Sequence, residues 1–267
     1  MPGPASAVDR LRYEPNHWAR DEDPGRALAS YLELCQRPFN RTKLEVMSGM
    51  LPAELAGQSV LDYGCGAGSF TVLCARRGAR VVAVDAEAAV LRTASYYARR
   101  EGVAERCRFL DRDTFARRLP GETFDVIVAK DVIEHVPDDQ GLLRDFARCQ
   151  RAGGRLLVST QSALSLTFVV ESLYFRVWRG EAGWCGWDPT HLRFYTPRSL
   201  ARKLRAAGYH PRRRHGFAIV PYRILTYALL FRRWIELPAL RYVDLWLGGR
   251  FPLNLFGWDV AVLAERA

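Results

Sequence analysis

A glycine-rich turn is the first feature of this sequence that could do chemistry. It reads Asp62-Tyr63-Gly64-Cys65-Gly66-Ala67-Gly68 and follows a short apolar run that begins at Ser59. Glycines allow the chain to bend sharply from a strand into a helix, and they let a ligand approach the backbone closely because no side chain stands in the way. Such turns also serve ordinary packing, so a second feature is needed to assign a ligand.

An acidic residue supplies that second feature. Asp85 closes a β-branched run about 20 residues after the turn, where a carboxylate can accept hydrogen bonds from both hydroxyls of a ribose. Turn and acid together predict a nucleoside site but leave the nucleoside open. A nicotinamide-dinucleotide fingerprint requires glycine at position 69 when Gly64 and Gly66 are its first two glycines, and Ser69 stands there instead.

Four segments, in order and at normal spacing over residues 59–160, resemble the class I S-adenosylmethionine-dependent methyltransferases. They are Leu61–Gly68, which resembles the D-x-G-C-G-x-G first motif; Phe109–Asp113, the third-strand end; Phe124–Val128 with Asp131–Val136, the F-D-x-V segment and its E-H-V continuation; and Gly153–Ser159, the fifth-strand entry. The E-H-V ending and the segment Asp188–Pro197 are similar to the ubiquinone-biosynthesis O-methyltransferases and their bacterial small-molecule relatives.

The resemblance implies S-adenosylmethionine as the cofactor, bound across the carboxyl ends of the first three strands. The amino-acid end would contact the turn, at Asp62, Gly64, Cys65, Gly66 and Gly68, and the ribose would contact Asp85 and Ala86. The adenine would contact Asp113, preferred to Asp111, and Thr114 at the third-strand end. Lys130 and Asp131 at the fourth-strand end would form the inner wall.

The same resemblance raises a divalent metal. In the ubiquinone-biosynthesis group an E-x-x-E-H segment is associated with a metal ion, and its counterpart here is Asp131, Glu134 and His135, with Asp in place of the first Glu. Helical spacing would put the three on one face, which suits oxygen-rich Mg²⁺ ligation. The alternative is that Glu134 and His135 cap and brace a helix beside the cofactor.

Histidines are the candidate general bases. His135 lies beside the expected cofactor edge, and His191 lies in an insertion where an acceptor would arrive, so either could take the proton of a hydroxyl that attacks the methyl group. Methyl transfer from a sulfonium needs mainly in-line alignment, so neither is obligatory, and a structural role for His191 stays open. His210 and His215 flank an arginine run and are expected at the surface.

The elements that must position these residues alternate short β-branched runs with amphipathic helices, which indicates βαβ units and a parallel sheet. The expected strands are Ser59–Asp62, Arg80–Asp85, Cys107–Leu110, Phe124–Ala129, Gly154–Thr160, Tyr209–Gly216 and Trp258–Ala264. The expected helices are Ser69–Arg77, Ala88–Glu101, Leu142–Arg151 and Pro197–Ala207. We therefore predict an α/β fold, a Rossmann-like doubly wound seven-stranded sheet whose last strand is antiparallel.

The predicted domain layout has two parts. Residues 1–50 form an arm and, over Ala27–Met50, helices broken at Pro38 that would cover the ligand, and residues 51–267 form the methyltransferase domain. The domain carries aromatic-rich helical insertions at about 161–196 and 217–252, after its fifth and sixth strands. These could be ordinary packing, walls for a hydrophobic acceptor, or a patch on a membrane surface, because arginines flank their apolar stretches.

The net charge and the cysteine pattern limit the partners and the compartment that we expect. A net charge of +10 favours acidic or phosphate-bearing surfaces, and an anionic membrane is a candidate, whereas no RNA-binding aromatic motif accompanies the arginines and nucleic acid is not expected. The Cys residues, 6 in all, are scattered without pairs, which indicates reduced thiols and a cytoplasmic protein, at most peripheral at the inner face of a membrane. No leader peptide or membrane-spanning run is evident.

The expected activity is methylation of a hydroxyl on a small, hydrophobic, phenolic or quinol-like acceptor or natural product. An N- or C-methyltransferase on a small molecule is an alternative within the same fold. A nicotinamide-dependent reductase and a non-catalytic binding module are alternatives of other classes, since a fold alone does not prove an activity. The oligomeric state is left open.

Overall fold

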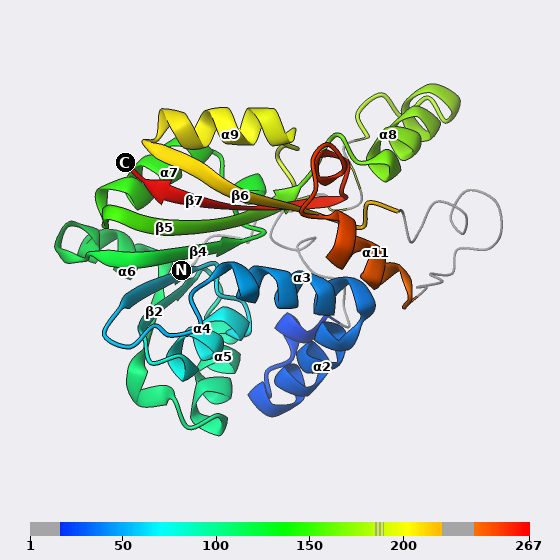
Figure 1. Ribbon diagram of the computed structural model, residues 1–267. Helices are drawn as coiled ribbons and strands as arrows, with labels where there is room; N and C mark the ends of the chain where they lie inside the picture. The colour runs from blue at the N-terminus through cyan, green and yellow to red at the C-terminus, as the bar shows by residue number, and fades with distance from the viewer. Residues whose placement is uncertain (1–16, 185, 187, 189, 221–237) are drawn as a thin grey trace, which may run out of the picture.

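The computed structural model describes residues 17–184, 186, 188, 190–220 and 238–267, and these form a seven-stranded sheet between two layers of helices (Figure 1). The strands stand in the order β3-β2-β1-β4-β5-β7-β6. Their bounds are β1 Ser59–Tyr63, β2 Arg80–Asp85, β3 Cys107–Asp111, β4 Phe124–Lys130, β5 Gln150–Gln161, β6 Tyr209–Phe217 and β7 Asp259–Arg266. All seven expected strands are present.

The sheet is doubly wound, as predicted. Strands β3, β2, β1, β4 and β5 pair in parallel, and only β7 runs antiparallel to both of its neighbours, β5 and β6. The central strands are buried on both faces, which is why β1, β2 and β4 are continuous apolar runs rather than alternating ones. The chain order reverses between β1 and β4, and in such sheets a ligand binds at the carboxyl ends of the strands beside that point.

Helices cover both faces of the sheet. The α-helices are α2 Pro24–Gln36, α3 Pro38–Met50, α4 Ser69–Arg76, α5 Ala88–Arg100, α6 Arg112–Arg118, α7 Asp139–Arg148, α8 Leu166–Leu173, α9 Pro197–Ala206 and α11 Leu240–Leu247. The shorter turns are η1 Trp18–Arg20, η2 Ala104–Arg106, η3 Leu119–Gly121, η4 Ile133–His135, η5 Tyr174–Trp178 and η6 Leu253–Leu255.

Two apolar clusters hold these layers together. One joins Phe115 of α6, Phe146 of α7 and Leu200 of α9 to one face of the sheet. The other joins Met47 of α3 and Phe70 of α4 to the opposite face. Because α3 shares this second core with α4, the helices of residues 1–50 are packed into the same body as the domain that follows them.

The N-terminal helices break at Pro38 as predicted, but α2 begins at Pro24 rather than Ala27. Asp23 explains the earlier start, because its side chain accepts a hydrogen bond from the Arg26 amide (2.7 Å) and caps the helix, with proline at the first helical position. Residues 1–16 of the expected arm lie outside the described residues.

The insertions are helical where they are described. The first contains α8 and η5, and the second contains α11 and η6. Several aromatic and basic residues of these insertions lie outside the described part, namely Trp187, Tyr222, Arg223, Tyr227, Phe231, Arg232, Arg233 and Trp234. None of the described helices combines the length and apolar character needed to span a bilayer.

His215 corrects one expectation. Its neighbour on β6, His210, is exposed as expected, but the His215 side chain is buried against Phe217, with ring centroids 5.0 Å apart, beneath the Gly248 turn after α11. A register shift between Pro211 and Arg213 sets His210 opposite Glu265 and His215 opposite Ala261, so both histidines lie on one face of the sheet, and the Gly248 turn covers His215 there. Burial lowers the pKa of His215 to about 4. A backbone hydrogen bond with Asp244 opposes this shift, and the charge of nearby Arg213 lowers the pKa slightly further.

We predict that His215 makes stability fall in mild acid. Its pKa is about 4 in the folded chain against 6.5 for its ordinary value, so the unfolded chain binds more protons between these values, and roughly 2 to 3 kcal/mol of stability is lost as pH falls through that window. A His215→Leu variant should show a flatter dependence in urea unfolding at a series of pH values. The exposed neighbour supplies the control, since His210→Leu should keep the wild-type slope; equal slopes in all three proteins would contradict the assignment.

Candidate active site

The glycine turn forms the centre of the site at the carboxyl end of β1. Gly64, Gly66 and Gly68 all have left-handed backbone conformations, with φ of 71°, 55° and 90°. The Gly64 and Cys65 amides donate to the Val84 carbonyl at 2.8 and 3.0 Å, which fastens the turn to the end of β2. Only glycine adopts these angles without strain, so the backbone geometry explains the motif.

The three glycines differ in what a side chain would meet. A Cβ at Gly64 would lie 2.4 Å from Val132 Cγ2, and one at Gly68 would lie 3.2 Å from Ala94 Cβ of α5. At Gly66 no described atom would lie within 4 Å. Packing against the protein therefore accounts for Gly64 and Gly68, while Gly66 alone keeps its backbone open to an approaching ligand.

Asp62 and Cys65 support the turn from below. Asp62 is buried, and its Oδ2 accepts a hydrogen bond from Thr71 Oγ1 of α4 at 2.6 Å. Burial raises the pKa of this carboxyl to about 6, against the opposing effect of the Thr71 hydrogen bonds. Burial likewise raises the pKa of the Cys65 thiol well above its ordinary value, so the thiol stays protonated. In this structure both residues hold the shape of the turn.

Asp85 stands at the end of β2 beside the turn. Its Oδ2 accepts the Gly66 amide at 3.0 Å and its Oδ1 accepts the Glu87 amide at 3.2 Å. Two amides thus fix the carboxylate in place, and each oxygen keeps a further lone pair for a ribose hydroxyl. Ala86 is exposed beside it. The ribose role of Asp85 and Ala86 stays a prediction, and the geometry is compatible with it.

The expected adenine residues lie at the next strand end. Asp111 closes β3 opposite Asp85, and its carboxylate caps α6 by accepting the Thr114 amide and hydroxyl at 2.8 and 2.6 Å. Asp113 is exposed in the first turn of α6. Thr114 is therefore already engaged by Asp111, and Asp113 remains the candidate for an adenine contact.

An ion-pair group lies at the ends of β4 and β7, with Lys43 and Asp259 buried and Lys130 and Asp131 partly exposed. Lys43 of α3 contacts Asp131 Oδ1 at 2.5 Å and also Asp259 Oδ2, while Lys130 contacts Asp131 Oδ2 at 2.9 Å. Ser159 donates to Asp131 as well, at 2.8 Å. Burial alone would raise the pKa of Asp131, but the two ammonium groups hold it below its ordinary value.

Lys43 and Asp259 were not identified from the sequence. The available signal was the position of Lys43 four residues from both Phe39 and Met47, on the face of α3 that packs inward. A lysine on an apolar helical face is either a surface residue whose stem covers the core or a buried charge with a partner, and its partners here are 88 and 216 residues away in the chain.

The expected Asp131, Glu134 and His135 metal set is not formed. Asp131 has a φ of 56°, and Ile133–His135 is a single 3₁₀ turn rather than part of an α-helix, so the three side chains do not share a helical face. Asp131 is also committed to two lysines and a serine. These residues do not fit an oxygen-ligated Mg²⁺ ion, and the one-face prediction was wrong.

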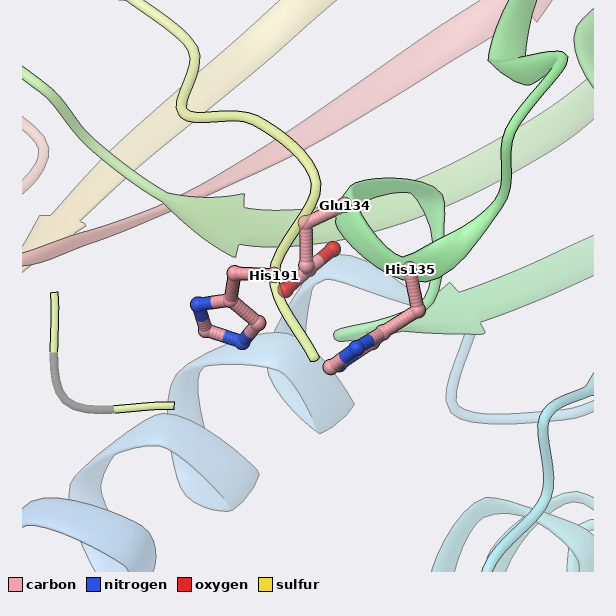
Figure 2. A group of neighbouring side chains, drawn as sticks. All are labelled: Glu134, His135 and His191. Carbon is pink, nitrogen blue, oxygen red and sulfur yellow. The ribbon is translucent and has the colours of Figure 1, made fainter. Parts of the chain in front are cut away.

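A different trio comes together instead. Glu134, His135 and His191 offer ligand atoms that all lie within 4.8 Å of one another, and Figure 2 shows the carboxylate beside the two imidazole rings. The Leu192 amide donates to the Glu134 carbonyl at 2.9 Å, which holds the two segments together. Burial and then the Asp131 charge raise the pKa of Glu134 to about 8, and burial lowers the pKa of His191.

Helix α2 covers the start of the site. Tyr31 Oη and Ser69 Oγ are 2.7 Å apart, so α2 lies across the beginning of α4, directly after the glycine turn. The Trp18 ring packs edge-on against Tyr31 with centroids 5.0 Å apart. The N-terminal segment therefore lies beside the glycine turn, and its role as a cover for the cofactor stays a prediction.

Comparisons with known proteins agree with this fold and site. A family model described as a methyltransferase domain matches residues 31–212, more than half of the chain. The ubiquinone biosynthesis O-methyltransferase of Cupriavidus pinatubonensis is 30% identical over 206 residues, which cover 75% of this chain and 76% of that protein. The enzyme of the same name from Xanthomonas euvesicatoria is 31% identical over 165 residues, covering 62% of this chain but only 64% of the relative, less than two thirds of its length.

A solved methyltransferase structure has a similar fold. The magnesium protoporphyrin IX methyltransferase of Synechocystis PCC 6803, determined with bound SAH, has a TM-score of 0.57 at 16% identity and covers 86% of each chain. The chain therefore belongs to the class I S-adenosylmethionine-dependent methyltransferase family. This membership confirms the resemblance of its motifs and disfavours the nicotinamide-dependent reductase.

We predict that Gly66→Ala weakens cofactor binding without a matching loss of folding. The new methyl group meets no described protein atom and would project into the space where a ligand reaches the backbone. Affinity for S-adenosylhomocysteine, measured by calorimetry, should fall at least about tenfold, which corresponds to roughly 1.4 kcal/mol.

Gly102→Ala is the matched control. Gly102 also has a left-handed φ, of 69°, and no described atom near its Cβ position, but it lies before β3 at the opposite edge of the sheet. Both variants should lose about 1 kcal/mol of stability from backbone strain. Equal affinities for the nucleoside in the two variants would remove Gly66 from the ligand site.

Proposed function

We propose that the chain transfers the methyl group of S-adenosylmethionine to a hydroxyl of a small, hydrophobic, phenolic or quinol-like acceptor. The observation that carries this is the alignment with an O-methyltransferase over three quarters of both chains. S-adenosylmethionine is the methyl donor of the family, and we assign its amino-acid end to the turn at Gly66 and its ribose to Asp85. An N- or C-methyltransferase is the alternative.

A hydroxyl nucleophile must lose a proton as it attacks, and the trio of Glu134, His135 and His191 contains side chains that can accept this proton. His191 is largely buried, and burial lowers its pKa, so at neutral pH its imidazole is unprotonated and can accept a proton. We assign the proton acceptor to His191 or His135. An amine acceptor would not need such a group, because a neutral amine attacks without prior deprotonation.

The experiment is a screen with radiolabelled S-adenosylmethionine against matched phenols, catechols, hydroquinones, anilines and amines. We expect label in an oxygen-methylated phenolic product, identified by mass spectrometry, and loss of that product with Gly66→Ala but not with Gly102→Ala. Label recovered only on nitrogen or carbon would overturn O-methylation while leaving methyl transfer intact. Binding of S-adenosylhomocysteine, measured in parallel, separates a wrong acceptor from a protein that does not bind the nucleoside.

We further propose that the insertions contact an anionic membrane surface. Helix α8, η5 and the region around α11 carry large apolar side chains with unusually high exposure, including Val177 at 75%, Trp178 at 84% and Phe251 at 80%. Arg176 and Arg179 stand among them, and the Arg250 guanidinium lies over the Trp246 ring at 4.6 Å. Apolar side chains beside arginines are typical of interfacial segments.

We expect cosedimentation with phosphatidylglycerol vesicles at low salt, reduced at high salt because the electrostatic part is screened. Trp178→Glu should weaken binding severalfold, because it replaces an apolar side chain that would insert among the lipids by a negative charge that the anionic vesicle repels. Tyr96→Glu on α5 is the control, because Tyr96 is also an exposed aromatic, at 37%, but lies outside the insertions. Absence of binding at low salt, or equal loss in both variants, would contradict the surface.

A further inference from the structure

A strongly basic surface lies at one edge of the sheet, on helix α9 and on the edge strand β6 against which this helix packs (Figure 1). Neither element contains an aspartate or a glutamate, whereas α9 carries Arg198, Arg202, Lys203 and Arg205, and β6 carries the run Arg212–Arg214. Lys203 pairs with Asp139, and Arg212 pairs with Glu265. Within the described ranges the other five basic residues form no ion pair, so the protein leaves most of this charge unbalanced.

Three of these arginines form a row on α9. Arg198, Arg202 and Arg205 are four and three residues apart, so they lie on one face of the helix, opposite Leu200 and Leu204, which pack into the core. The row spans seven residues, which corresponds to about 10 Å along the helix axis. A row of this length can contact more than one anionic group of a ligand.

The row borders a hollow in the surface. The three arginines line it together with Thr196 and Ser199, and its volume is about 380 Å³. The Ser199 amide donates to Thr196 Oγ1 at 3.0 Å and the Thr196 amide donates to Ser199 Oγ at 2.9 Å, so these two hydroxyls already cap the helix. The lining residues include no carboxylate, and the hollow therefore offers guanidinium donors to a ligand without an acidic group to repel it.

Arg214 adds a fourth guanidinium on the same side of the sheet. It stands opposite Val262 of β7, which belongs to the same apolar cluster as Leu200, so its side chain lies on the α9 side. Its Nε is buried and has no hydrogen-bond partner among the described residues. Burial and then the charge of nearby Arg205 lower the pKa of Arg214. An unpaired buried donor beside a like charge is unfavourable, and a bound anion would relieve both costs.

The position of β6 at the edge of the sheet explains only part of this charge. Basic side chains on an edge strand hinder its pairing with another chain, and the exposed Arg212 and Arg213 suit that role. Edge protection does not account for the row on α9, which is a helix, or for Arg214, whose Nε is buried.

We propose that Arg198, Arg202, Arg205 and Arg214, the α9–β6 arginine face, bind the phosphate groups of a ligand that carries more than one of them. The planar guanidinium donates two parallel hydrogen bonds to a phosphate, and the length of the row favours several phosphates over one. S-adenosylmethionine carries no phosphate, so this site is additional to the cofactor site and goes beyond the proposed methyl transfer. The phosphates could belong to a soluble polyphosphate compound or to a row of lipid headgroups.

The test uses the full chain and tripolyphosphate as the probe, with affinity measured by calorimetry at low salt. We expect saturable binding of one tripolyphosphate per chain. Arg202→Gln and Arg205→Gln should each weaken it about 10-fold or more, because each removes charge-assisted hydrogen bonds. Arg202→Lys should weaken it severalfold, since it keeps the charge but loses the planar group.

Arg148→Gln is the matched control, because it removes an equal charge from an exposed arginine on α7, away from the face. S-adenosylhomocysteine affinity should be unchanged in every variant, which shows that each is folded and that the two sites are separate. Phosphatidylglycerol vesicles distinguish the sources: vesicle binding that Arg202→Gln abolishes, without any binding of tripolyphosphate, would assign the same arginines to lipid headgroups. No binding of either probe, equal weakening by Arg148→Gln, or full affinity in Arg202→Lys would overturn the proposal.

Discussion

The ammonium of Lys43 between Asp131 and Asp259 is the contact on which the arrangement of the site depends. Lys43 and Asp259 are buried and Asp131 is partly exposed, and a buried charge is costly without a partner, so the lysine and the carboxylates at the ends of β4 and β7 stabilise one another. Burial raises the pKa of Asp259 even so, which marks how strongly this group relies on the lysine. Because Lys43 belongs to α3, the ion-pair group fixes the N-terminal helices over the carboxyl edge of the sheet.

That contact also shapes the chain that follows β4. With its side chain held by Lys43, Lys130 and Ser159, Asp131 takes a left-handed backbone conformation and turns the chain away from the strand direction. The next residue, Val132, then packs against Gly64 of the cofactor turn, and the residues after it present Glu134 and His135. One ion-pair group therefore couples the glycine turn to the trio of Glu134, His135 and His191, although the two share no direct hydrogen bond among those described.

The sequence predicted most of the fold because its signals are local. Every expected strand is present, with ends within a residue or two for β1, β2, β3 and β4, since buried parallel strands are short β-branched runs bounded by turns. β5 starts earlier than expected, at Gln150, because Phe124 pairs with Gln150 before a register shift that precedes the Val126 to Arg155 pair. Likewise α7 starts at Asp139, where the Asp138 side chain accepts the Gly141 amide at 2.7 Å. Such irregular pairings and caps depend on side-chain contacts that periodicity does not reveal.

The candidate site divides in the same way between local and distant contacts. The glycine turn and Asp85 could be found because their backbone angles and spacing are written in one short stretch. The resemblance to an E-x-x-E-H segment grouped Asp131, Glu134 and His135, and the helical spacing expected there fails because Asp131, paired with Lys43 from 88 residues earlier, has a left-handed backbone conformation. His191 meets Glu134 only through the fold. We therefore expect the nucleoside to be recognised mainly by backbone that local sequence dictates, whereas the proposed reacting edge is assembled from side chains that only tertiary structure brings together. It follows that enzymes of this fold can keep one cofactor site while their acceptor chemistry changes through residues that no short motif contains.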